Sequence, residues 1–184
     1  MNNAMKMKKI KESRYINIAS LTKYMKKSEH VLELGCGQCI LSKRLKDKGY
    51  NITSVDVKDR SIYPDIIPII YNGKKLPFKD NEFDTCMIIA VLHHTCKPEL
   101  ILWEATRVSK KLIVREDIYN NFFQKYYAYF MDSLLNKEFI GHPHTNKNDS
   151  GWRKVFKKLK LKLIEADYFM SWKYLQNVDY YLEK

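Results

Sequence analysis

Two closely spaced cysteines, Cys36 and Cys39, could do redox or metal chemistry in the segment ELGCGQC (33–39). A C-x-x-C pair is typical of dithiol oxidoreductases and of half a zinc site. The same segment carries Gly35 and Gly37, and closely spaced glycines after a strand are typical of a turn that holds a nucleotide. The segment by itself leaves both interpretations open.

The other cysteines do not complete a metal site. Cys86 and Cys96 form no second C-x-x-C, which disfavours a four-cysteine zinc ribbon. The count of histidines does not exclude a site of two cysteines and two histidines, but no H-x3–5-H pair is present. A thioredoxin-like site needs an aromatic residue before the first cysteine, and Gly35 stands there. We therefore favour a nucleotide turn and expect no metal, with a dithiol oxidoreductase as the remaining alternative.

An acidic residue supports the nucleotide interpretation. Asp56 ends the β-branched segment NITSVDV, about twenty residues after the glycine turn. A parallel α/β fold places a carboxylate there to accept the two hydroxyls of a ribose. Ile40 occupies the third glycine position of G-x-G-x-x-G, so a nicotinamide dinucleotide site is disfavoured.

Strands and helices alternate along the chain, and the pattern predicts a single α/β domain over 1–184. The expected architecture is a three-layer αβα, Rossmann-like, seven-stranded and mostly parallel sheet with a closing antiparallel strand. Pro68 places its strand at an edge, and Ser150 is expected to cap the last helix. The expected strands cover 30–34, 51–57, 66–70, 83–91, 111–117, 161–168 and 174–182, and the expected helices 40–48, 99–108, 120–136 and 152–159.

Composition limits the location and the partners. The 184 residues are 45% hydrophobic with a formal net charge of +12. No apolar run is long enough to span a bilayer, and the basic N-terminus lacks the apolar stretch of a signal peptide, so we expect a cytoplasmic protein. Lysines cluster at 6–11, 23–27 and 154–162. They could attract nucleic acid, but they lack interleaved arginine and aromatic residues, so nucleic acid is not favoured as a partner.

Several ordered motifs together resemble class I S-adenosylmethionine-dependent methyltransferases, and within them the small-molecule branch similar to ubiquinone and menaquinone methyltransferases. The segments are VLELGCGQCILSKRL, VDV, LPFKDNEFDTCMIIAVLHHT and GWRKVFKKLKLKL. They cover about residues 28–170. The resemblance implies S-adenosylmethionine as the cofactor and S-adenosylhomocysteine as the product. It says little about the substrate.

Carried over position by position, the resemblance implies a set of cofactor-binding residues. Asp56 would bind the ribose hydroxyls, Asn72 would lie near the adenine, and the backbone of Ala90 and Val91 would contact the methionine part. Cys39 replaces the usual third glycine, which is tolerable if its backbone is in an ordinary conformation. The implied set is Glu33, Gly35, Cys36, Gly37, Asp56, Asn72, Gly73, Ala90 and Val91.

A base helps if the acceptor is a hydroxyl or an amine. The candidates are His94, after the fourth strand, and Asp117 or Glu116, after the fifth. Asp117 could equally cap the next helix, and the pair His93–His94 could simply order its loop.

Substrate contacts are expected from the segment 117–150, a helix and a lid loop that follow the fifth strand. Tyr119, His142 and His144 are the candidates, and the aromatic helix 120–136 could form a pocket wall or simply core. The first 28 residues would form an N-terminal helical segment.

We expect methyl transfer to a small molecule by in-line displacement. The alternatives are the same fold acting on RNA or protein, and a non-catalytic cofactor-binding member.

Overall fold

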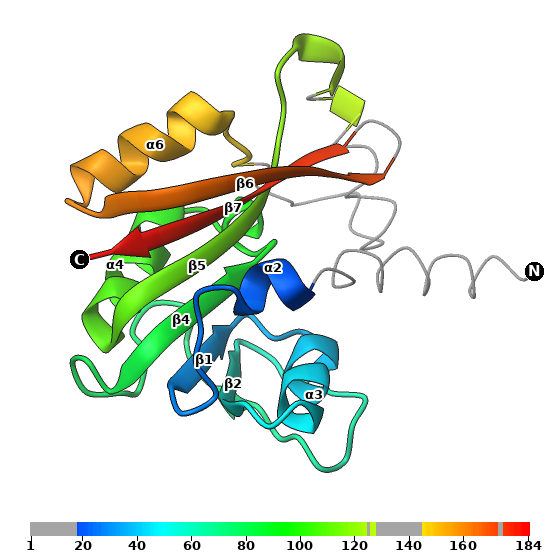
Figure 1. Ribbon diagram of the computed structural model, residues 1–184, viewed down its shortest axis with the longest axis vertical. Coiled ribbons are helices and arrows are strands. Elements are labelled where there is room, and N and C mark those ends of the chain that lie inside the picture. Colours follow the sequence, from blue (N-terminus) through cyan, green and yellow to red (C-terminus); the bar gives the residue numbers. More distant parts are fainter. Residues whose placement is uncertain (1–17, 125, 128–144, 173–174) are drawn as a thin grey trace, which may run out of the picture.

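The computed structural model describes residues 18–124, 126–127, 145–172 and 175–184. Its centre is a seven-stranded sheet with the order β3-β2-β1-β4-β5-β7-β6 (Figure 1). The strands are β1 His30–Leu34, β2 Asn51–Asp56, β3 Ile69–Ile70, β4 Phe83–Ile89, β5 Ser109–Ile118, β6 Lys162–Trp172 and β7 Leu175–Glu183.

Most strand pairs in this sheet are parallel. β1 pairs in parallel with β2 and β4, β2 with β3, and β4 with β5. β7 runs antiparallel to both of its neighbours, β5 and β6. The predicted fold class, a mostly parallel sheet with one antiparallel closing strand, is therefore confirmed.

Helices cover both faces of the sheet, because the central strands are apolar on both sides. α2 (Ile18–Thr22) and α3 (Ile40–Asp47) pack on one face through Leu21, Leu41 and Leu45. α4 (Pro98–Val108) and α6 (Asp149–Lys158) pack on the other through residues that include Leu102 and Trp152. A short 3-10 helix, η1 (Leu92–His94), follows β4.

Two helix caps differ from the sequence predictions. Ser150 does not cap α6: Asn148 does, since its side-chain oxygen accepts a hydrogen bond from the Gly151 amide at 2.9 Å. Asp117 is not a helix cap, because β5 continues through Ile118. The Asn121 side chain instead accepts from the Gln124 amide at 2.9 Å, where the chain becomes helical. Most of the expected helix 120–136 lies outside the described residues.

The edge strand β3 is shorter than expected. Only Ile69 and Ile70 pair with β2, just after Pro68, which has no amide hydrogen to donate. The edge position predicted from Pro68 is confirmed. Among the described residues, no helix has the length and apolar character needed to cross a membrane.

Candidate functional site

The predicted cofactor residues come together at one edge of the sheet. β1, β2 and β4 are parallel neighbours, so the turns that follow them lie side by side at the carboxyl edge. The turn after β1 is tied to β2, because the amides of Gly35 and Cys36 both donate to the Val55 carbonyl, at 2.8 and 3.1 Å.

Gly35 lies directly against the turn that follows β4. Its φ of +79° is in the left-handed region, which favours glycine. A Cβ atom at this position would lie 2.5 Å from Cγ2 of Val91. The close approach of the two turns therefore requires glycine at position 35.

Gly37, the second glycine of the turn, faces open space. A Cβ atom there would meet nothing within 4 Å, although φ is +53°. The Gly37 amide donates to Oδ2 of Asp56 at 2.7 Å, and Oδ1 of Asp56 accepts from the Val57 amide at 2.7 Å. The Asp56 carboxylate is thus bonded to the glycine turn next to the open space at Gly37, which fits a ribose beside a small-residue turn.

The two cysteines of this turn are buried beneath it. Their Sγ atoms lie 3.5 Å apart as free thiols, 5% and 0% exposed. Burial raises the pKa of Cys36 and of Cys39 above the ordinary value of a thiol. Reactive C-x-x-C pairs have a lowered pKa, so this geometry opposes the oxidoreductase alternative. Among the described residues, no group of three or more potential metal ligands is found.

Cys39 does not have the ordinary backbone expected for it. Its φ is +59°, in the left-handed region, where it precedes α3 as the N-cap residue. A non-glycine residue in this region costs about 1 to 2 kcal/mol. The condition set for Cys39, an ordinary backbone, is therefore not met: the position has a glycine-like conformation, and the buried side chain packs against Cys36 and Ile66.

Glu33 lies under the turn, in the core. The side chain is 3% exposed and accepts a hydrogen bond from the Ser42 hydroxyl on α3, and Ser42 Oγ lies 2.6 Å from Ser54 Oγ on β2. Burial, first of all, raises the pKa of Glu33 to about 7. Glu33 therefore joins β1, β2 and α3 and supports the turn from within the core.

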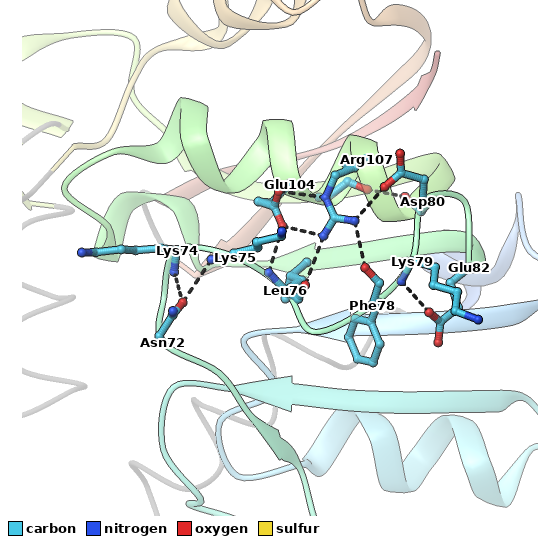
Figure 2. Close-up of polar contacts among 12 residues, drawn as sticks. Asn72, Lys74, Lys75, Leu76, Phe78, Lys79, Asp80, Glu82, Glu104 and Arg107 are labelled. Carbon is cyan, nitrogen blue, oxygen red and sulfur yellow. Dashed lines mark hydrogen bonds and ion pairs between the residues drawn. The ribbon is translucent and has the colours of Figure 1, made fainter.

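The segment after β3 is held by an ion pair on α4, as Figure 2 shows. Glu104 accepts the Leu76 amide at 2.8 Å and pairs with Arg107 at 2.8 Å. Arg107 donates in turn to the carbonyls of Leu76 and Phe78, at 3.1 and 2.8 Å, and to Asp80 at 2.8 Å. Arg107, the largest cause, holds the pKa of Glu104 below its ordinary value. The Glu104–Arg107 pair thus fixes residues 76–80, which follow Asn72, the residue expected near the adenine.

Asn72 and Gly73 lie near the start of the segment after β3. The Asn72 side-chain oxygen accepts from the amides of Lys74 and Lys75, at 2.9 and 3.1 Å (Figure 2). A Cβ atom at Gly73 would lie 3.4 Å from Cγ1 of Val57. Val57, the residue directly after Asp56, is 46% exposed and was not singled out from the sequence.

The turn after β4 is organised by Glu116 of β5. Oε1 of Glu116 accepts from the amides of Val91 and Leu92, at 3.1 and 2.8 Å. Oε2 lies 2.5 Å from Nδ1 of His93. Glu116 and His93 are both 0% exposed, and the His94 ring packs on His93 with the centroids 4.2 Å apart. Because the Glu116 carboxylate is buried and already bonded to Val91, Leu92 and His93, this geometry disfavours Glu116 as a base.

The two predicted catalytic residues follow neighbouring strands: His94 lies in η1 after β4, and Asp117 lies near the end of β5. Asp117 is one residue from Glu116 on a strand, so the side chains of Glu116 and Asp117 point to opposite faces. Asp117 is 5% exposed and accepts from Asn177 Nδ2 at 2.5 Å. His94 is half-buried, and its ring packs on the ring of His93.

The predicted substrate residues are described only in part. Tyr119 is half-buried directly after β5. His142 and His144 lie outside the described residues. Thr145, which the sequence did not single out, contacts the turn after β4: its hydroxyl donates to the carbonyls of Leu92 and Thr95, at 3.1 and 3.0 Å.

Comparisons with known proteins agree with this geometry. Residues 32–112 match the family model described as a methyltransferase domain. This stretch runs from β1 into β5 and contains the glycine turn, Asp56 and the turn after β4. Residues 32–112 match this methyltransferase domain family, and the fold around them is that of class I S-adenosylmethionine-dependent methyltransferases. The cofactor of this domain class is S-adenosylmethionine, as expected; nothing singles out the ubiquinone-like branch.

Solved structures with the same fold support the match. A putative methyltransferase of Haloferax volcanii, solved with the Trm112 methyltransferase activator, has a TM-score of 0.77 at 13% identity and covers 98% of this chain and 93% of its own. A methyltransferase of Methanosarcina mazei has a TM-score of 0.69 at 18% identity, and the match covers 90% of this chain and 96% of the other. Magnesium protoporphyrin IX methyltransferase of Synechocystis, solved with S-adenosylhomocysteine, has a TM-score of 0.69 at 14% identity. The match covers 100% of this chain and 89% of the other. No curated protein sequence matches.

Proposed function

We propose that this methyltransferase domain transfers a methyl group from S-adenosylmethionine to a small-molecule acceptor. The observation that carries the proposal is the hydrogen bond of the Gly37 amide to Asp56, next to the open space at Gly37 and to the close approach of Val91 to Gly35. Magnesium protoporphyrin IX methyltransferase and 1,6-didemethyltoxoflavin-N1-methyltransferase, both solved with S-adenosylhomocysteine, are small-molecule enzymes of the same fold.

The cofactor, when bound, supplies a methyl group already activated on a sulfonium sulfur. The work of the chain is to hold the cofactor and an acceptor in line and to keep water out. Asp56 would accept the ribose hydroxyls. Asn72 Oδ1 already accepts two amides, so its NH2 group would donate to an adenine ring nitrogen.

His94 is the remaining candidate for a base. It is half-buried in the turn after β4, beside the expected methionine end, whereas Asp117 is buried against Asn177. If the acceptor is a hydroxyl or an amine, His94→Asn would lower kcat with little effect on cofactor affinity. A carbon or thiolate acceptor would leave kcat unchanged in this variant.

Nucleic acid is less favoured as the acceptor. The lysine cluster at 154–162 covers the end of α6 and the start of β6. In the sheet register, Lys162 of β6 lies opposite Glu183 of β7. On its other side, Glu183 lies opposite Lys111, near the start of β5. This is the amino edge of the parallel strands, opposite the candidate cofactor site.

The first test is calorimetric titration with S-adenosylmethionine and S-adenosylhomocysteine, on the wild type and on Asp56→Ala. Binding by the wild type that is lost in the variant supports the proposal. A labelled-methyl search through small-molecule, RNA and protein fractions then identifies the acceptor class. Absence of binding to either compound contradicts the proposal, and binding without transfer to any fraction favours a non-catalytic member.

A second candidate is a methyltransferase that works with a protein activator. Ile67, Ile69 and Ile70 are 81%, 40% and 50% exposed at the β3 edge, and large exposed apolar groups on an edge strand are typical of a protein-binding surface. The Haloferax volcanii protein of the same fold was solved with an activator. Co-expression with a Trm112 protein, followed by size-exclusion chromatography, tests for a complex; separate elution contradicts this candidate.

A further inference from the structure

The turn after β4 contains a strained residue directly beside the cofactor site. Ala90 has a φ of +55°, in the left-handed region. Such a conformation is strained for alanine and persists only where the surroundings hold it. The Ala90 amide donates to the Arg115 carbonyl at 2.8 Å, which continues the pairing of β4 with β5. The residues after Ala90 lie beyond the end of this strand pairing, so another group must hold their backbone.

Glu116 supplies that hold. Its Oε1 atom accepts the two consecutive amides of Val91 and Leu92, and its Oε2 atom contacts His93 Nδ1. A carboxylate that accepts several donors forms charge-assisted hydrogen bonds, which are stronger than neutral ones. Because Glu116 is on the central strand β5, the turn is fastened to a rigid part of the sheet.

The consequence reaches the glycine turn through Val91. With its amide held by Glu116, Val91 places Cγ2 2.5 Å from the position that a Cβ of residue 35 would occupy. The turn after β1 and the turn after β4 are thereby kept in contact. Both turns border the candidate cofactor site, so their spacing sets its width.

The same turn also receives the chain that leads into α6. The Thr145 amide donates to the His93 carbonyl at 3.3 Å, and the Thr145 hydroxyl donates to the Leu92 carbonyl at 3.1 Å. Glu116 therefore holds a turn that contacts the glycine turn on one side and residue 145 on the other.

We propose that Glu116 is the positioning residue of the cofactor site: it holds residues 90–93 so that Val91 closes against Gly35. Since Glu116 is 0% exposed, it acts without touching the cofactor. The part of the proposal that concerns cofactor affinity rests on the proposed function. The hydrogen bonds of Glu116 to the amides of Val91 and Leu92 do not depend on that function.

Two variants and one control test the proposal. Glu116→Ala removes all three contacts and leaves two buried amides without their acceptor. Glu116→Gln keeps the shape and an oxygen for the two amides, but presents NH2 to His93 unless the amide turns round. The matched control is Glu29→Gln, since Glu29 accepts from Thr85 Oγ1 at 2.7 Å and pairs with Lys111 at 2.8 Å. Those partners lie at the amino edge of the sheet.

The affinity measurement is calorimetric titration with S-adenosylhomocysteine, well below the Tm of each variant. We expect Glu116→Ala to weaken binding by about tenfold or more, Glu116→Gln by about threefold, and Glu29→Gln to bind as the wild type does. Equal affinity in all four proteins overturns the proposal. So does a loss in Glu29→Gln as large as that in Glu116→Ala, because general destabilisation would then explain both. If Glu116→Ala does not fold, wild-type affinity in Glu116→Gln overturns it.

Amide hydrogen exchange separates this proposal from the proposed function. Val91 and Leu92 should exchange faster in Glu116→Ala, and the amides of β1 should not change. Unchanged protection of Val91 and Leu92 overturns the proposal even if the cofactor binds. A wild type that binds no S-adenosylhomocysteine contradicts the proposed function, and the exchange result still decides whether Glu116 holds the turn.

Discussion

Val91 fills the space that a side chain at residue 35 would need. The gap between Cγ2 of Val91 and a Cβ built on Gly35 is 2.5 Å, and both Val91 methyl groups lie within 3 Å of that point. Real Cβ atoms do not approach other atoms this closely, so the contact ties the type of residue 35 to the position of the turn after β4.

Gly35→Ala should therefore disrupt both stability and cofactor binding. The added methyl group meets Val91, and alanine is strained at φ +79°. We expect a loss of roughly 2 to 4 kcal/mol in the free energy of unfolding, measured by urea denaturation. Gly37→Ala is the matched control: it is strained at φ +53° but meets no atom, so its loss should be only about 1 kcal/mol. Equal losses in the two variants would show that Val91 does not restrict residue 35.

Glu33 should make stability depend on pH. Burial raises its pKa from the ordinary 4.5 to about 7. Since the folded-state pKa lies above the unfolded one, the stabilisation is full below pH 4.5 and is lost as the pH rises through 7. Between these limits the change is on the order of 3 kcal/mol.

Glu33→Gln isolates this effect, because glutamine does not titrate. The difference in unfolding free energy between wild type and variant should shift in favour of the variant as the pH rises from about 5 to about 8. Other acids contribute equally to both proteins and cancel in the difference. A difference that stays constant over this range would mean that Glu33 titrates at its ordinary pKa in the folded protein.

Cys39→Gly should be less destabilising than Cys39→Ala. Both variants lose the buried thiol, but only glycine is free of strain at φ +59°. We expect an advantage of about 1 kcal/mol for glycine, seen as a higher Tm in thermal denaturation. A higher Tm for the alanine variant would contradict the left-handed backbone at this position.

The thiols themselves should be dispensable for cofactor binding. In Cys36→Ser with Cys39→Ser, we expect S-adenosylhomocysteine to bind within about threefold of the wild type, because buried thiols with a raised pKa are not reactive groups. Loss of all activity with cofactor binding retained would restore the dithiol oxidoreductase alternative.

Arg107→Ala should destabilise the segment after β3. The variant leaves the buried Glu104 carboxylate without its cation and removes donors from the carbonyls of Leu76 and Phe78. We expect a loss of roughly 3 kcal/mol in unfolding free energy. Arg153→Ala, which breaks the more exposed pair with Asp149, should cost about 1 kcal/mol or less. Equal effects would mean that the contacts drawn in Figure 2 contribute no more than a surface ion pair.

The sequence by itself determined the fold class and the place of the glycine turn. The glycines of ELGCGQC and the acid that ends NITSVDV follow their strands directly, so local pattern places them at the carboxyl edge once the sheet is parallel. Pro68 likewise placed β3 at the edge, because the missing amide hydrogen is a property of the residue itself.

Only the tertiary structure decided the roles of neighbouring residues. Glu116 and Asp117 are adjacent, yet one holds the amide of Val91 and the other accepts from Asn177 on the opposite face. The left-handed backbone of Cys39 and the contact of Val91 with Gly35 also could not be predicted. These features depend on contact partners that are distant in the chain. The alternation along a strand predicts that two neighbouring side chains point to opposite faces, but it does not predict which residues they contact.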